Sequence, residues 1–198
     1  MPLPVVRAPK IGRNGFVCAL SAAAALASSA GTATAKDFLD VRARDQCDPA
    51  TFNAGRATPL CNPAHGGSVT LAEFQAALPN GGHDAWKFNP GPSGAHLDFG
   101  GVVQVTSDAG ETHTFTRVKT FGGGIVPALN AAVGNAATVD ECAAMVAGGP
   151  LHATPTGIVV TSPSTQVFQA GNSMQFQRGI NLYQCCIHPW MRTIITVR

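Results

Sequence analysis

From residue 86 onward the chain is a series of short segments rich in β-branched and aromatic residues, each bounded by Gly, Pro, Asn or Asp. Such residues pack well on a pleated surface, and such boundaries favour turns. The expected strands are residues 86–88, 102–106, 112–118, 157–161, 166–168, 173–177, 181–185 and 192–197. Many short strands joined by turns are typical of an antiparallel β-sandwich. We therefore expect an all-β domain over residues 83–198.

Two stretches depart from this strand pattern. Residues 36–82 look irregular and are expected to form an N-terminal extension with one short helix. That helix begins after Thr70, because Thr70 and Glu73 match a capping box, in which each side chain satisfies the other residue's backbone amide. Residues 121–155 are rich in Gly and Ala and form a long insertion before the C-terminal strands, with a short helix expected at 140–146. A connection of this length is either functional or mobile.

The first 35 residues have the features of a secretory signal peptide. Residues 1–15 contain three basic residues and no acidic one, and an apolar run follows over residues 16–27. Residues 33–35 then read Ala-Thr-Ala, a small-x-small cleavage pattern. The apolar run is shorter than the roughly 20 residues that a membrane-spanning helix needs. We expect residues 1–35 to be removed on export, which leaves a periplasmic or secreted mature chain without a membrane span.

The charge balance excludes two classes of partner. The chain has thirteen Lys and Arg and eleven Asp and Glu. Three of the basic residues lie in the predicted signal peptide, which leaves ten against eleven and a net charge of −1. Since no basic run or charge block remains, the sequence offers no electrostatic feature that would bind nucleic acid or an anionic membrane surface.

The cysteine count is more specific than the composition. Cys18 belongs to the predicted signal peptide, and five cysteines remain: Cys47, Cys61, Cys142, Cys185 and Cys186. Thiols of exported proteins tend to pair, so an odd number leaves one over. A thiol left over in that setting is a reactive group, an intermolecular bridge or a metal ligand.

Near the C-terminus, Cys185, His188 and Met191 place a thiolate, an imidazole and a thioether within seven residues. His and Cys with a weak axial Met are the donors of blue-copper sites, and soft donors select copper over calcium or magnesium. Zinc is the competing metal. A structural zinc site needs four strong ligands, however, and Met is a poor one.

The spacing Cys185-x-x-His188-x-x-Met191, followed by an alternating strand, resembles the copper loop of the cupredoxins, the exported blue-copper proteins that include plastocyanin, azurin and bacterial amicyanin. The short spacing is most similar to that of amicyanin. The family also has an upstream histidine after a strand and a turn, and His113 follows such a segment over residues 103–112. The resemblance implies a Greek-key β-sandwich that holds one type 1 copper ion through His113, Cys185, His188 and Met191.

The same resemblance implies roles for the neighbours of these ligands. Many members carry Asn after the first histidine, where it braces the copper loop, whereas this chain has Thr114, which implies a weaker brace. Electrons are expected to pass through His188, under an apolar docking patch formed by Pro189 and Trp190. The alternative is that Trp190 is a core residue, since large aromatic side chains serve both roles.

Adjacent residues near a strand end point to opposite faces, so Cys185 and Cys186 cannot both bind one ion. The family register selects Cys185 as the ligand. It leaves Cys186 to form a disulfide with Cys142 in the insertion, and Cys47 to pair with Cys61. The remaining histidines have no motif around them and are expected not to bind copper; they are His65, His83, His96 and His152.

Taken as a cupredoxin, the chain is expected to be a one-electron carrier between redox partners outside the cytoplasm, and not an enzyme. Its partners would bind transiently, and the protein would be a monomer. The main alternative is a periplasmic protein that binds or delivers copper without an electron-transfer role. A third is a structural binding module in which copper is incidental and the Gly-rich insertion is the interaction surface.

Overall fold

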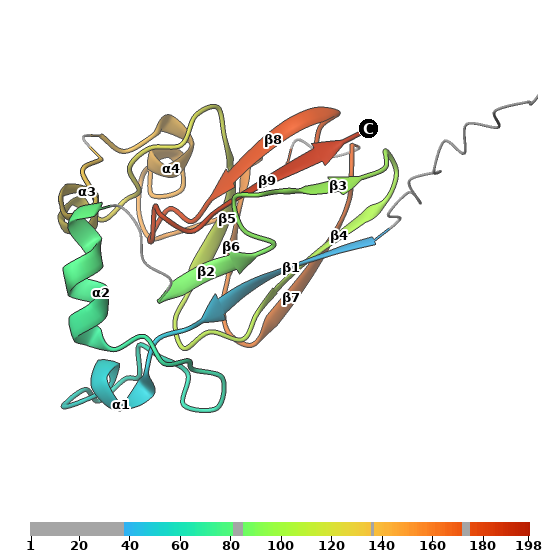
Figure 1. Ribbon diagram of the computed structural model, residues 1–198. Helices are drawn as coiled ribbons and strands as arrows, with labels where there is room; N and C mark the ends of the chain where they lie inside the picture. Colours follow the sequence, from blue (N-terminus) through green and yellow to red (C-terminus); the bar gives the residue numbers. More distant parts are fainter. Residues whose placement is uncertain (1–37, 81–84, 136, 172–174) are drawn as a thin grey trace, which may run out of the picture. The chain divides into compact units, whose positions relative to one another are not determined.

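The computed structural model describes residues 38–80, 85–135, 137–171 and 175–198 (Figure 1). The predicted signal peptide, His83 and the first two residues of the strand expected at 173–177 lie outside this part. How the chain divides at residues 82 and 83 stays a prediction. Within the described residues, no helix is long and apolar enough to cross a membrane.

The described strands form two sheets. The first is a four-stranded sheet of order β2-β1-β4-β7, and the second is a five-stranded sheet of order β3-β9-β8-β5-β6. The first contains β1 (Phe38–Asp45), β2 (Trp86–Asn89), β4 (Val102–Ser107) and β7 (Ser164–Gln169). The second contains β3 (Ala95–Leu97), β5 (His113–Val118), β6 (Gly157–Val160), β8 (Gly179–Gln184) and β9 (Arg192–Val197).

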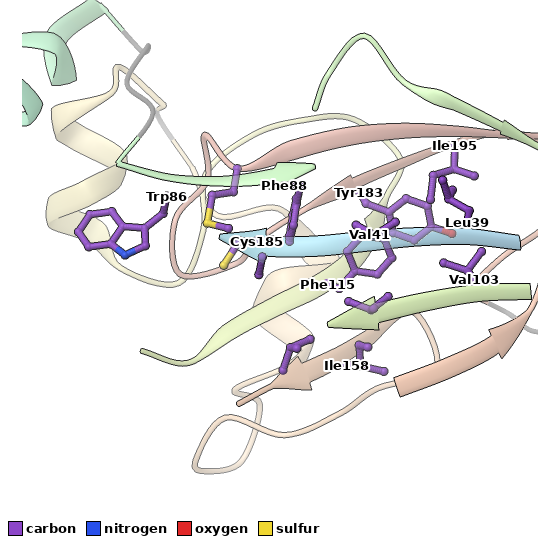
Figure 2. Packing of buried hydrophobic residues seen from close by; sticks show 14 of the residues in the cluster. Leu39, Val41, Trp86, Phe88, Val103, Phe115, Ile158, Tyr183, Cys185 and Ile195 are labelled. Atoms are coloured by element: carbon purple, nitrogen blue, oxygen red, sulfur yellow. The ribbon is translucent and has the colours of Figure 1, made fainter. Parts of the chain in front are cut away.

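The core lies between the two sheets. Val41 and Val103 of the first sheet belong to the same buried cluster as Phe115, Tyr183 and Ile195 of the second (Figure 2). The rings of Phe115 and Tyr183 stack with centroids 4.3 Å apart. Buried and more exposed positions alternate along β4 and β9, as expected for strands with one face on a core. The predicted all-β sandwich is therefore confirmed.

The expectation that residues 36–82 are irregular is wrong for β1. This strand is central in its sheet, antiparallel to β2 and parallel to β4. Apolar Leu39, Val41 and Ala43 alternate with charged residues and point inward, a period-two strand pattern that the sequence analysis overlooked. β3 and β9 are also parallel, and the sandwich is mixed, not antiparallel as expected. Residues 175–177, which were expected to continue a strand, do not form one.

The helices of the N-terminal segment match the local sequence signals. Helix α2 (Leu71–Ala77) begins with the predicted capping box of Thr70 and Glu73, and a 3₁₀ turn, η1 (Leu78–Asn80), follows it. Helix α1 (Pro49–Phe52) was not expected, although Asp48 caps it with Pro49 in the first turn. Together α1 and α2 direct Phe52 and Phe74 onto Trp86, with ring centroids 5.2 and 5.3 Å from that ring.

The insertion is built against the rest of the sandwich. It contains α4 (Asp140–Ala144), close to the expected helix, and α3 (Pro127–Ala132), which the sequence analysis did not anticipate. The amide of Ile125 donates to the Cys186 carbonyl at 2.7 Å, and a Cβ on Gly124 would overlap the same carbonyl oxygen. Asn130 closes the neighbouring turn through two hydrogen bonds to the Gly124 backbone. A long segment without strands thus packs directly on the chain beside Cys185.

Candidate metal centre

The pairing of β5 with β8 brings the first two candidate ligands together. His113 is the first residue of β5, and Cys185 directly follows β8, which runs antiparallel to it. Since Thr116 lies opposite Gln184 in this ladder, the start of β5 meets the end of β8. The backbone amide of Thr114 accordingly donates to Cys185 Sγ at 3.3 Å.

The turn from Cys185 to Met191 closes on itself. The Met191 amide donates to the His188 carbonyl at 2.9 Å, and the Cys185 amide donates to the Met191 carbonyl at 3.0 Å. The His188 amide donates to Cys185 Sγ at 3.4 Å. These bonds fix the sulfur with two amide donors and hold His188 and Met191 beside it.

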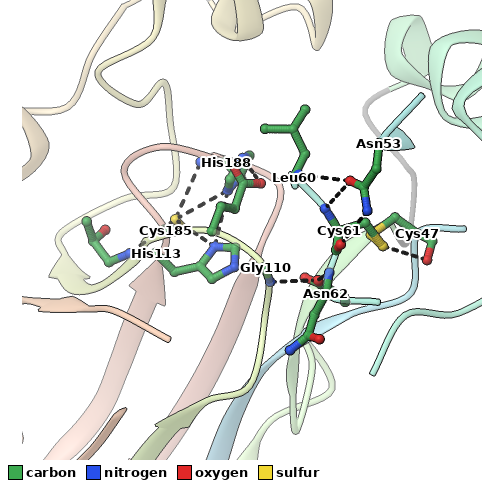
Figure 3. Close-up of polar contacts among 12 residues, drawn as sticks. Cys47, Asn53, Leu60, Cys61, Asn62, Gly110, His113, Cys185 and His188 are labelled. Carbon is green, nitrogen blue, oxygen red and sulfur yellow. Dashed lines mark hydrogen bonds and ion pairs between the residues drawn. A yellow bond between two sulfur atoms is a disulfide. The ribbon is translucent and has the colours of Figure 1, made fainter. Parts of the chain in front are cut away.

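The donor atoms of His113, Cys185 and His188 converge (Figure 3). Cys185 Sγ lies 3.9 Å from Nδ1 of each histidine, and the two Nδ1 atoms lie 3.2 Å apart. A planar three-coordinate ion with bonds of about 2.05 Å to N and about 2.3 Å to S would place the nitrogens about 3.5 Å apart and the sulfur about 3.8 Å from each. The observed triangle fits a single ion within a few tenths of an ångström.

All four residues predicted to bind copper are buried. His113 and Cys185 have no exposed surface, and Met191 and His188 are 1% and 4% exposed. Cys185 is also the one described cysteine outside a disulfide. A buried thiol between two imidazoles is an unusual arrangement unless a metal ion or a charge pair holds it, because burial alone disfavours charge.

The charges of this group are coupled. Burial opposes ionisation of Cys185, but hydrogen bonds with His113 and His188 and their positive charge hold the pKa of its thiol well below the ordinary value. Burial likewise opposes protonation of His188, but Cys185 and Glu111 raise its pKa to about 9. The metal-free centre therefore favours a thiolate beside an imidazolium. A thiolate is the form of cysteine that binds metal, and binding would release the histidine proton.

Thr114 contacts the turn that carries Cys185. Its Oγ1 accepts a hydrogen bond from the Cys186 amide at 2.6 Å, and Thr116 Oγ1 donates to it at 3.2 Å. Thr114 has no exposed surface. The hydroxyl thus reaches the backbone directly after Cys185, and the expectation of a brace weaker than that of Asn stays a prediction.

The surroundings of His188 differ from the expected exposed patch. Trp86 stacks on its ring with centroids 4.9 Å apart and an interplanar angle of 12°, and the Trp190 ring lies 5.3 Å away. Pro189 is buried, and the Arg192 side chain turns back to donate to its carbonyl at 2.8 Å. Trp190 is half-buried and packs against Phe74 of α2. An aromatic cluster built by the N-terminal segment therefore covers the histidine face.

Two functional neighbours were missed by the sequence analysis. Trp86 was recognised as a strand residue, and Glu111 as part of a turn, but neither was placed at the centre. Glu111 Oε1 lies 3.1 Å from His188 Nε2. No local spacing links Glu111 to His188, so only the pairing of β5 with β8 and the closed turn bring them together.

The structure contains both disulfides that the sequence favours. Cys47 and Cys61 are joined with an S–S distance of 2.05 Å, and Cys142 and Cys186 with one of 2.01 Å. Three other histidines, His65, His96 and His152, are exposed and lie outside the donor cluster.

No protein-family model matches the chain, and no curated protein matches it. A purple cupredoxin from Nitrosopumilus maritimus is similar to it at 14% sequence identity, over 81% of this chain and 99% of that one, with a TM-score of 0.38. An oxidised amicyanin mutant is similar at 15% identity, over 54% of this chain and 70% of that one, with a TM-score of 0.30. A multicopper oxidase from Campylobacter jejuni is similar at 13% identity, over 82% of this chain and 30% of that one, with a TM-score of 0.38.

In this chain two sheets pack as a sandwich, and a Cys-x-x-His-x-x-Met turn joins the last two strands beside a histidine on β5. The fold is cupredoxin-like. In this cupredoxin-like chain, the insertion and the N-terminal helices both contact the predicted copper turn, through Cys142 and through Phe74 respectively.

Proposed function

We propose that this protein binds one type 1 copper ion and carries single electrons between redox partners outside the cytoplasm. The observation that carries the proposal is the buried triangle of His113 Nδ1, His188 Nδ1 and Cys185 Sγ, whose dimensions fit one ion. Met191 is proposed as the weak fourth donor, because it is buried in the same closed turn. Copper with these donors supplies a one-electron Cu(II)/Cu(I) couple.

The surrounding chain suits such a role because it holds the donors in place. Two backbone amides point at the Cys185 sulfur, and Thr114 and the Cys142–Cys186 disulfide anchor the residue after it. A ligand set that cannot rearrange lets both oxidation states share one geometry. Hydrogen bonds to the sulfur and the apolar surroundings are also the features by which proteins adjust the potential of such a site.

Burial favours electron transfer over catalysis at this centre. The four residues are at most 4% exposed, so no open position faces solvent for a substrate. A catalytic metal site needs such a position. Among the described residues, the other cluster of possible ligands is Asp45, Cys47 and Cys61, and its two sulfurs already form a disulfide. We therefore propose a carrier and not an enzyme.

The location and the partners follow from the same features. Two disulfides favour an oxidising compartment, which agrees with the proposed signal peptide and with a periplasmic or secreted protein. Redox partners bind through small, transient interfaces, so we propose a monomer with no permanent partner. Trp190, half-buried beside His188, is the proposed contact through which electrons leave.

Voltammetry of the copper-loaded protein without its signal peptide tests the function. A carrier gives a reversible one-electron wave and exchanges electrons with a small inorganic oxidant without losing copper. A protein that binds Cu(I) alone and releases it to a chelator on oxidation would contradict the proposal and support copper delivery. Turnover of oxygen or of a phenolic substrate would contradict it in favour of an oxidase.

A further inference from the structure

The two nitrogens of His188 face different surroundings. Nδ1 points to Cys185 Sγ and His113 Nδ1, at 3.9 and 3.2 Å, and is the metal-facing atom. Nε2 forms an ion-pair contact with Glu111 Oε1 at 3.1 Å that lies outside hydrogen-bond geometry, and the Glu111 side chain is 22% exposed. His113 differs in this respect, because its buried Nε2 has no hydrogen-bond partner in the described part of the chain. Only one of the two histidines thus has a carboxylate behind it.

Glu111 is held in this position by a set of contacts from the N-terminal segment. Asp45 Oδ2, at the end of β1, accepts hydrogen bonds from the Asn62 amide at 2.6 Å and from the Gly110 amide at 2.8 Å. The Asn62 side chain donates to the Asp108 carbonyl at 2.6 Å. A Cβ on Gly110 would overlap the Asn62 amide nitrogen, so the loop before Glu111 packs tightly on this segment. The carboxylate is therefore placed by the fold.

The ring of His188 is also fixed on its face, by the Trp86 stack at 4.9 Å. With its face on Trp86 and Nε2 at Glu111, the imidazole has one orientation that keeps Nδ1 at the centre. A metal-binding histidine whose second nitrogen donates to a carboxylate is held in one tautomer and is a more basic ligand.

We propose that Glu111 is a positioning residue for the copper centre. Glu111 keeps a proton on Nε2 of His188, so that Nδ1 is the atom that binds copper. Its negative charge also stabilises Cu(II) relative to Cu(I). This inference rests on the proposed function for its redox part. The contact between Nε2 and Glu111 does not depend on copper, because the metal-free imidazolium also carries a proton on Nε2. The two parts can therefore be tested separately.

Two substitutions separate geometry from charge. Glu111→Gln keeps an oxygen that can accept from Nε2 and removes the charge, whereas Glu111→Ala removes both. Glu141→Gln is the matched control, since Glu141 accepts from the Lys119 amide on the insertion side and makes no contact with His188. Removal of a carboxylate next to a ligating histidine typically changes metal affinity 10- to 100-fold.

The first measurement is ¹H–¹⁵N NMR of the imidazole in the metal-free protein. We expect a protected Nε2-bound proton of His188 in wild type, Glu111→Gln and Glu141→Gln, and its loss to solvent exchange in Glu111→Ala. Equal protection in all four proteins would overturn the positioning role, and so would an unprotected proton in wild type. If Glu111→Ala does not fold, Glu111→Leu, which keeps a side chain of similar size without a polar atom, takes its place with the same expected loss of protection.

The second measurement is the reduction potential of the copper-loaded proteins. We expect Glu111→Gln to lower the affinity for Cu(II) relative to Cu(I) about tenfold, which raises the potential by about 59 mV, with no such change in Glu141→Gln. A potential equal to that of the control would overturn the charge effect. If wild type binds no copper, the proposed function fails, and the NMR result still decides the role of Glu111 in placing the His188 proton.

Discussion

Thr114→Val tests how the fold holds the turn that carries Cys185. Thr114 is completely buried, and its Oγ1 accepts the Cys186 amide at 2.6 Å. Valine has nearly the same shape without the oxygen, so the variant leaves a buried N–H without its acceptor. That loss costs about 1–3 kcal/mol of the free energy of unfolding. The hydroxyl of Thr116 also loses one partner, but it keeps its contact with Met145 Sδ at 3.0 Å.

The assay is urea denaturation of the metal-free protein. A shift of the midpoint with an unchanged m-value shows that the substitution has changed only the stability. For a domain of this size, each kcal/mol corresponds to about 2–4 °C in Tm. Thr116→Val is the control, because it removes a donor to Thr114 and leaves the Thr114–Cys186 bond intact. A destabilisation below about 0.5 kcal/mol for Thr114→Val, the range of neutral surface changes, would refute the reasoning. So would a larger loss in the control.

Three further predictions follow from other parts of the structure. Removing the Cys142–Cys186 disulfide, which closes a separation of 44 residues, should lower the free energy of unfolding by about 4 kcal/mol. Removing the Cys47–Cys61 disulfide, across 14 residues, should lower it by about 3 kcal/mol. Denaturation of the two Cys→Ala pairs measures both, and a larger loss for the Cys47–Cys61 pair would contradict the loop-entropy account. Met191→Leu should keep copper bound and raise the reduction potential, since a weak donor to Cu(II) is lost; an unchanged potential would show that Met191 is not a ligand. Burial raises the pKa of Asp45, so its protonated form is favoured in the folded protein. The free energy of unfolding of wild type, compared with that of Asp45→Asn, should therefore be highest at low pH and decrease as pH rises through the Asp45 pKa. Unfolding free energies of the two proteins that change in parallel with pH would contradict this.

The sequence was sufficient to predict the elements and site residues whose signal lies within a few neighbouring residues. β5 and β9 follow β-branched runs, α2 follows a capping box of two residues, and the turn from Cys185 to Met191 is readable as a donor set because its members are adjacent. The register of the copper loop also leaves Cys186 on the opposite side from Cys185, where the structure joins it to Cys142.

The sequence was insufficient to predict contacts and strand positions that depend on segments far apart in the chain. β1 does carry a local signal that the sequence analysis overlooked, because Leu39, Val41 and Ala43 alternate with charged residues, but its central place depends on pairing with β2 and β4. Glu111 and Trp86 meet His188 only after the sheets have paired. Trp190 is half-buried for the same reason, since α2 brings Phe74 against it, and its role in docking stays a prediction.

The most direct test of the central claim is the visible absorption spectrum after addition of Cu(II) to the wild-type protein and to Cys185→Ser. A thiolate bound to Cu(II) gives an intense charge-transfer band, so the wild type should turn strongly coloured and the Cys185→Ser protein should not. The Cys142→Ala/Cys186→Ala pair should keep the band, because those sulfurs form a disulfide away from the donor triangle. A colourless wild type, or a band of equal intensity in Cys185→Ser, would contradict the account.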